Sequence, residues 1–190
     1  MKSAVAILMF TLLAAALTSR AEDIPGMADF LKEVNAACKR QDVARLEGLQ
    51  YEAGAAPEMR KADHARWTYV LSGNCPEAGW HFDMVTFNPL ESLAKPVTEV
   101  QIGSAGSEEA RLATQRINDG RKDVLDSVTK PQSLKGKRYE YNLKVIGFVA
   151  IIFAKDRLQS GVMFPVGLDP EGRVRFSLLR PVEEDASPRP

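Results

Sequence analysis

The segment that most constrains the fold is an apolar run near the end of the chain, from Val145 to Ala154. It contains no polar side chain, and only Gly147 interrupts its bulky residues. A β-strand sends alternate side chains to opposite faces of its sheet. Here both sets are apolar: Val145, Val149, Ile151 and Phe153 on one face, and Ile146, Phe148, Ala150 and Ile152 on the other. Such a strand must be covered on both faces.

Two covers are available for the second face. Helices from the N-terminal third can bury one face only, so the other must meet either the segment 103–137 or a second copy of the chain packed sheet to sheet. Left exposed, this face would promote aggregation. We therefore expect either self-cover by residues 103–137 or a homodimer formed through the sheet.

The N-terminus has the pattern of a secretory signal peptide. Lys2 precedes an apolar run from Ala4 to Leu17, and the small residues Ser19 and Ala21 fit a cleavage site. The run is shorter than the roughly 20 residues that span a bilayer, which disfavours an uncleaved anchor. We therefore expect a secreted or periplasmic protein with no membrane span after cleavage.

These patterns divide the chain into three parts. Residues 1–21 are interpreted as the leader and residues 22–182 as one domain, with 103–137 as an excursion from its sheet. The acidic, proline-containing tail 183–190 is expected to be disordered.

The charge balance excludes one class of partner. The 190 residues include 25 basic and 25 acidic side chains, and the leader removes Lys2 and Arg20 but no acid. The mature chain is thus slightly acidic, without the positive charge typical of nucleic-acid-binding proteins. We expect no nucleic-acid partner.

The first third of the domain is predicted to be helical. One apolar stripe begins at Met27 and continues through Phe30, Val34 and Cys38. Asp42 is placed to cap a second, short helix. Pro57 suits the first turn of a third helix, which runs to Val70.

From Gly79 the apolar period changes to two. This predicts a first strand with Trp80, Phe82 and Met84 facing inward. A helix from Ser107 to Asn118, closed by Gly120, is expected inside the excursion. The C-terminal third then predicts an antiparallel meander of three strands, over 139–154, 162–168 and 173–178, with a tight turn over 169–172.

The order of elements is that of an α+β roll, in which N-terminal helices pack on a strongly bent antiparallel sheet ending in a three-strand meander. It resembles the nuclear transport factor 2-like superfamily, with the cystatin-like arrangement as a neighbour. The matching segments are the helix from Met27 followed by Arg40, Gln41 and Asp42, and the closing hairpin with Ser160–Gly161, Pro165–Gly167 and Gly172–Phe176. The superfamily contains isomerases, dehydratases, cyclases and non-catalytic binding modules, so the resemblance implies a fold and leaves function open.

Cys38 and Cys75 are the two cysteines of the chain. In an exported protein they predict one disulfide, which would join the first helix to the loop before the first strand. The alternative is that Cys38 is simply a buried thiol of the apolar stripe.

His81 and Asp83 share one face of the first strand and are the candidate catalytic pair. In a roll of this type they would act as a general base and its orienting partner, with Trp80 as a candidate ligand contact. The alternative, favoured because the bulkier set normally faces the core, places both in solvent. His64 is expected to be solvated. Since the two histidines are far apart in sequence, no metal site is predicted.

Three functional hypotheses follow. We favour an exported, non-catalytic domain that binds a small ligand or a protein. The runner-up is an isomerase or dehydratase that uses His81 and Asp83 in an apolar pocket. The third is a structural envelope component that contacts an anionic polymer through the basic cluster Lys130, Lys135, Lys137 and Arg138. The chain has no P-loop, G-x-G-x-x-G or G-x-S-x-G motif, and we expect no cofactor.

Overall fold

The computed structural model of the chain describes residues 23–73, 75, 78–98, 106–156 and 158–182. The predicted leader 1–21 and the predicted disordered tail 183–190 lie outside the described residues.

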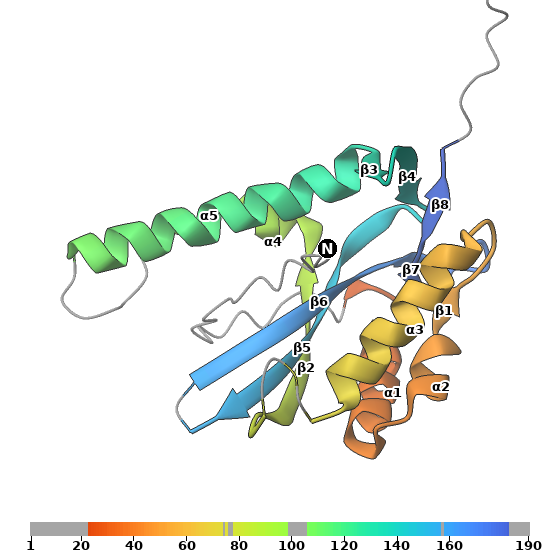
Figure 1. The fold of residues 1–190 in the computed structure, drawn as a ribbon, viewed down its shortest axis with the longest axis horizontal. Helices are drawn as coiled ribbons and strands as arrows, with labels where there is room; N and C mark the ends of the chain where they lie inside the picture. The colour runs from red at the N-terminus through yellow and green to blue at the C-terminus, as the bar shows by residue number, and fades with distance from the viewer. Residues whose placement is uncertain (1–22, 74, 76–77, 99–105, 157, 183–190) are drawn as a thin grey trace, which may run out of the picture.

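The fold is α+β, as predicted (Figure 1). The helices are α1 (Met27–Arg40), α2 (Val43–Glu47), α3 (Pro57–Leu71), α4 (Leu90–Ala94) and α5 (Glu108–Thr129). The strands are β1 (Gln50–Tyr51), β2 (His81–Pro89), β3 (Gln132–Leu134), β4 (Lys137–Tyr141), β5 (Val145–Lys155), β6 (Leu158–Leu168), β7 (Val174–Ser177) and β8 (Leu179–Pro181).

The described strands form two sheets. One has the order β1-β7-β6-β5-β2 and the other the order β3-β4-β8. The predicted meander is confirmed, because β5, β6 and β7 are consecutive antiparallel neighbours. The larger sheet is mixed rather than wholly antiparallel, because the short strand β1 runs parallel to β7.

The three predicted N-terminal helices are confirmed, with the expected local signals. The apolar stripe of α1 is buried at Met27, Phe30, Val34 and Cys38. The Asp42 side chain caps α2 by accepting a hydrogen bond from the Arg45 backbone N–H at 2.9 Å. Pro57 is the first residue of α3.

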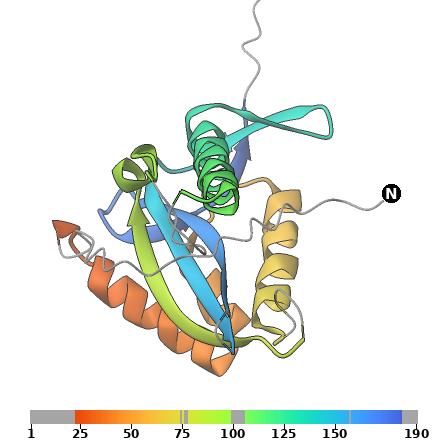
Figure 2. The same ribbon diagram turned by 90° about the vertical axis from the view of Figure 1, so that its left-hand side faces the viewer.

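The helices lie on both sides of a strongly curved sheet (Figure 2). Residues of α1, α2 and α3 join the inward side chains of β5, β6 and β7 in the main core. α4 and the C-terminal half of α5 join Val145 and Phe148 of β5 in a second, smaller core.

This second core shows what covers the other face of β5. Val124, Leu125 and Val128 of α5 pack with Val145 and Phe148, so the excursion covers the first half of this face. The predicted sides of Val145 and Ile146 are wrong, because a register shift between Val145 and Gly147 places Val145 in the second core and Ile146 against the main core. Further along the same face, Ala150 is 0% exposed and Ile152 is 5% exposed within the single chain.

α5 extends further than the sequence indicated. It begins where predicted, with the Ser107 hydroxyl accepting a hydrogen bond from the Ala110 backbone N–H at 3.2 Å, but it passes through Gly120 to Thr129. The prediction that Gly120 ends the helix is wrong. Gly120 is buried, and the apolar residues of the next two turns supply packing that offsets the low helix propensity of glycine.

The predicted tight turn after β6 is held by the Asp169 side chain. Its Oδ1 accepts hydrogen bonds from the backbone N–H groups of Glu171 (3.0 Å) and Arg173 (2.9 Å), and its Oδ2 pairs with the Arg173 guanidinium (2.8 Å). Burial alone would raise the pKa of Asp169, but these hydrogen bonds and the positive charge of Arg173 outweigh it and lower the pKa to about 2.

The predicted strand 139–154 is instead two strands, β4 and β5, and Asn142 causes the break. Its Nδ2 donates to the carbonyls of Tyr51 (2.6 Å) and Ala53 (3.1 Å). Its Oδ1 accepts from the Ser177 hydroxyl (3.1 Å) and the Leu178 backbone N–H (2.9 Å). One side chain therefore joins the end of β1, the β7–β8 junction and the corner between β4 and β5.

We predict that Asn142→Ala lowers the free energy of unfolding by about 2–3 kcal/mol, because it leaves the backbone N–H of the buried Leu178 and the carbonyl of the half-buried Tyr51 without these partners. Chemical denaturation monitored by circular dichroism measures this, with Asn35→Ala on α1 as the control. A loss no larger than that of the control would contradict the structural role of Asn142.

Candidate functional site

The concave face of the larger sheet is where a roll of this type would hold a ligand, and aromatic rings occupy it here. Trp67 of α3 stacks on Phe164 of β6 with ring centroids 3.7 Å apart and an interplanar angle of 11°. Phe176 of β7 lies 5.1 Å from Trp67, and Phe30 of α1 lies 5.0 Å from Phe176. Trp67 is 0% exposed, and the three phenylalanines are at most 6% exposed. Within the described residues, these four rings pack together between α1, α3 and the sheet.

The candidate pair His81 and Asp83 lies at the exposed start of β2, and both side chains are exposed. Trp80 and Phe82 are half-buried against the main core, as predicted by the alternative that places His81 and Asp83 in solvent. Because both side chains are exposed among the residues that the structure describes, their local setting does not favour acid–base catalysis.

The strand alternation was predicted correctly up to Phe82 and wrongly at Met84. A register shift between Phe82 and Met84 turns the strand, so that Met84 is 44% exposed and Val85 packs against the core instead. A β-bulge of this kind adds one residue to one strand and moves every later side chain to the opposite face. No residue type in the segment signals it.

Cys38 and Cys75 are both free thiols buried in the main core. Burial raises the pKa of Cys38 to about 12 and raises that of Cys75 as well. Because the thiolate is the reactive form, burial lowers the reactivity of both thiols in this structure. The predicted disulfide stays a prediction.

A carboxyl group with a strongly raised pKa lies on α3, where no sequence pattern indicated a functional residue. Asp63 is half-buried, and its Oδ2 accepts a hydrogen bond from Gln50 Nε2 at 2.9 Å. Burial raises its pKa to about 6, with a smaller contribution from the negative charge of Glu47; Arg66 acts in the opposite direction. A carboxyl group of this kind can exchange a proton near neutral pH.

Arg66, one turn along the same helix, is held by the sheet. Its Nη2 donates to the Met163 carbonyl at 2.8 Å, and its guanidinium carbon lies 4.2 Å from the centre of the Phe164 ring. Burial lowers its pKa. β7 pairs with β6 only at Val166–Leu168, so Met163 belongs to a stretch of β6 that β7 does not reach.

The bonds of this pair are therefore structural. Asp63 bonds to β1 and Arg66 to β6, and their role is to fix α3 against the sheet. His64 is exposed, as expected, and its Nδ1 lies 2.7 Å from Glu47 Oε1 of α2. Sequence reasoning missed Asp63 and Arg66 because the significance of both depends on strands distant along the chain. Within the described ranges, no group of three or more His, Cys, Asp or Glu is arranged to hold a metal ion.

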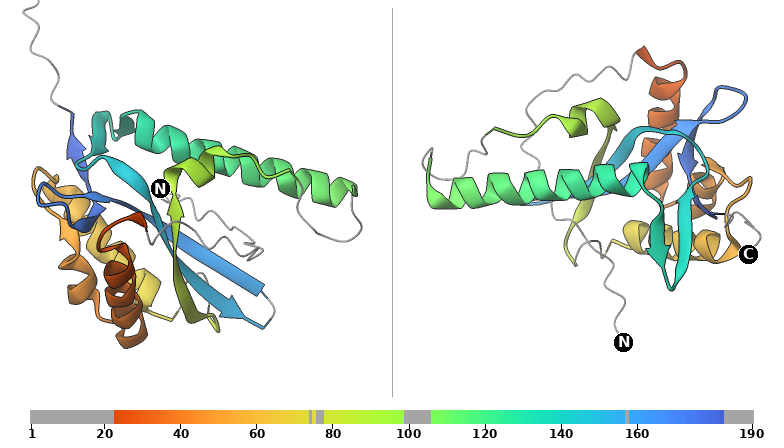
Figure 3. Two further views of the ribbon diagram at one scale, coloured as in Figure 1. Left: turned by 180° about the vertical axis from the view of Figure 1, so that it is seen from behind. Right: turned by 90° about the horizontal axis from the view of Figure 1, so that it is seen from above.

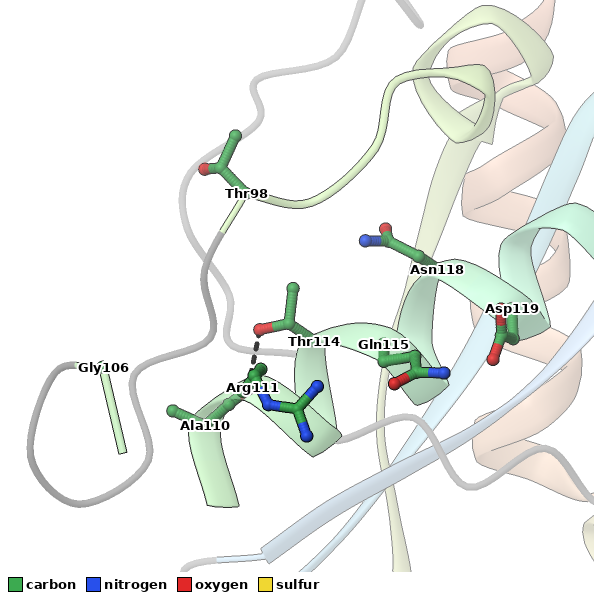
Figure 4. Close-up of a pocket in the computed structure, with 8 residues that line it drawn as sticks. All are labelled: Thr98, Gly106, Ala110, Arg111, Thr114, Gln115, Asn118 and Asp119. Atoms are coloured by element: carbon green, nitrogen blue, oxygen red, sulfur yellow. Dashed lines mark hydrogen bonds between the residues drawn. The ribbon is translucent and has the colours of Figure 1, made fainter. Parts of the chain in front are cut away.

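An open groove of about 630 Å³ runs beside the N-terminal half of α5 (Figure 4). Three of its polar side chains are engaged within the chain. Arg111 pairs with Glu108 at 2.6 Å, Thr114 donates to the Ala110 carbonyl at 2.8 Å, and the Asn118 amide bonds both the N–H and the carbonyl of Val97.

The chain matches no known protein-family model, no curated protein and no solved structure. None of the described helices has both the length and the apolar content needed to cross a membrane.

Asp63 gives a pH-dependent prediction. Its carboxyl group takes up a proton near pH 6 in the folded chain but only near pH 4 in the unfolded chain. Between these values the folded state binds the extra proton, so this group increases stability as the pH falls from about 6 to 4.

Asp63→Asn keeps an acceptor for Gln50 and removes the buried charge. We predict that it raises the free energy of unfolding at pH 7 by about 1–3 kcal/mol and abolishes the pH dependence due to this site. Urea titrations from pH 4 to 7 measure both effects, with the exposed Asp119→Asn as the control. Destabilisation by Asp63→Asn at pH 7 would show that the ionised carboxylate stabilises the fold.

Proposed function

We propose that the chain is an exported, non-catalytic binding domain that contacts its partner through its outer surface. The filling of the concave face by Trp67, Phe164, Phe176 and Phe30 supports this most directly, because a small-ligand site needs a concave, largely preformed cavity. Of the two kinds of partner that the sequence left open, this favours a macromolecule over a small ligand.

The isomerase or dehydratase alternative receives less support. It needs His81 and Asp83 inside an apolar pocket, whereas both are exposed at the start of β2. The shifted pKa of Asp63 belongs to a group that is bonded to Gln50, on the side of α3 that faces α2 and β1.

Membership of the nuclear transport factor 2-like superfamily is part of this proposal. It is supported by the order of elements, with α1 and α2 followed by a short strand and by a curved sheet whose last strands form a meander. Export is supported by the apolar leader and its small-residue cleavage site.

For the assembly we propose a monomer and retain the homodimer through the sheet as the alternative. A dimer was expected only if the second face of β5 lacked cover, and that face is buried within one chain. Light scattering of the mature protein at tens of micromolar should give the mass of one chain. A dimer that dissociates when Met84 of the edge strand β2 is changed to Lys would contradict this.

The absence of a core ligand can be tested with small apolar probes. We predict that the wild-type protein does not bind indole or benzene, as measured by calorimetry or by a rise in melting temperature. Phe164→Ala should lower the free energy of unfolding by about 3–5 kcal/mol and open a cavity that binds these probes. Leu168→Ala, at an exposed position, is the control.

Stoichiometric probe binding by the wild-type protein would contradict the proposal and restore the small-ligand hypothesis. Because that measurement uses the unaltered chain, it remains decisive even if Phe164→Ala fails to fold.

A further inference from the structure

The hairpin formed by β3 and β4 projects from the body of the molecule beyond the end of α5 (Figures 2 and 3). Its two strands pair in the register Gln132↔Tyr139, Ser133↔Arg138 and Leu134↔Lys137. The two turn residues, Lys135 (φ 51°) and Gly136 (φ 78°), are both left-handed, which is the conformation of a tight type I′ turn. The hairpin is thus a narrow projection with a defined tip.

The base of the hairpin is fixed to the body. Tyr139 is 3% exposed, and its hydroxyl donates to Glu58 Oε1 at the start of α3 over 2.8 Å. On its other side β4 pairs with β8, and the Val182 backbone N–H donates to the Arg138 carbonyl at 3.0 Å. These contacts fix the direction in which the hairpin projects from the body.

The tip combines positive charge with an exposed apolar side chain. Lys130, Lys135, Lys137 and Arg138 lie within one short segment that contains no acidic residue. Lys130 pairs with Asp126 at 3.0 Å, and Lys137 lies 4.0 Å from Glu58. In the part of the chain that the structure describes, Lys135 and Arg138 have no ion-pair partner. Leu134, which directly precedes Lys135 and pairs with Lys137 across the hairpin, is 38% exposed.

We propose that this tip docks on an anionic lipid surface, with Leu134 entering the headgroup region and the cations lying against the lipid phosphates. The proposal rests on the proposed function, since it names the partner of an exported domain that acts through its surface. Clustered Lys and Arg side chains beside an exposed apolar residue are typical of peripheral membrane contacts. A soluble anionic polymer would be bound by the cations alone and would not require Leu134.

The test is co-sedimentation of the mature protein with vesicles of phosphatidylcholine alone and with vesicles that also contain phosphatidylglycerol. We expect binding only to the anionic vesicles, decreasing steeply as salt is raised, because exposed charges are screened. Lys135→Asn with Arg138→Gln should weaken binding about 25-fold, since each cation near a charged membrane contributes about fivefold. Asn is chosen at position 135 because it tolerates a left-handed backbone. Leu134→Ser should weaken binding about threefold.

Two variants serve as matched controls. Lys122→Gln removes an exposed cation on α5, and Leu112→Ser removes an apolar side chain that is 39% exposed, against 38% for Leu134. Both should bind the anionic vesicles as the wild-type protein does.

Three results would overturn the proposal. They are no binding of the wild-type protein to anionic vesicles, equal losses in the control variants, and a Leu134→Ser protein with wild-type vesicle binding. If the last is accompanied by hairpin-dependent binding to soluble polyphosphate, the partner is an anionic polymer. The apolar-probe experiment is independent of these outcomes, so this proposal can fail while the proposed function stands.

Discussion

The contact between α3 and the curved sheet is the interaction on which the rest of the structure depends. Trp67 stacks on Phe164, and Arg66 both lies against the same ring and donates to the Met163 carbonyl beside it. This places one helix over a stretch of β6 that β7 does not reach. The contact both fills the concave face and satisfies a backbone group at the margin of the sheet.

This arrangement limits what the fold can do. A curved sheet covered by helices is suited to enclosing a ligand, but here the same space is closed by packed aromatic rings. The perturbed carboxyl group of Asp63 and the guanidinium of Arg66 both serve the attachment of α3. This packing of the described interior is the reason why we propose that a partner is recognised at the surface.

Much of the fold could be predicted from local pattern. The stripe of α1, the Asp42 cap and Pro57 at the start of α3 act within one or two helical turns, so their effects are visible in sequence. The apolar run of β5 also indicated that both of its faces are buried.

The remaining features depend on long-range contacts and could not be predicted in this way. Asn142 ends β4 because its amide reaches residues near 51 and 177. Met84 faces outward because of a bulge that only the pairing with β5 defines. The extension of α5 beyond Gly120 is the exception, since the apolar residues at 124, 125 and 128 continue the helical period and carried a usable signal.

The candidate site residues show the same difference between local pattern and long-range contact. The sequence pointed to His81 and Asp83 because polar residues alternate with apolar ones there, and alternation alone does not distinguish a pocket from a solvent face. Asp63 and Arg66 looked like ordinary charges of a surface helix. Their burial arises from β1 and β6, which lie far away in the sequence.

The fluorescence of Trp67 reports whether the concave face is closed to solutes. The chain has two tryptophans, so a Trp80→Phe variant reports on Trp67 alone. Trp67 is 0% exposed, and we predict that acrylamide scarcely quenches its emission. Quenching as efficient as that of an exposed indole would show that solutes enter between α3 and the sheet, and would contradict the account.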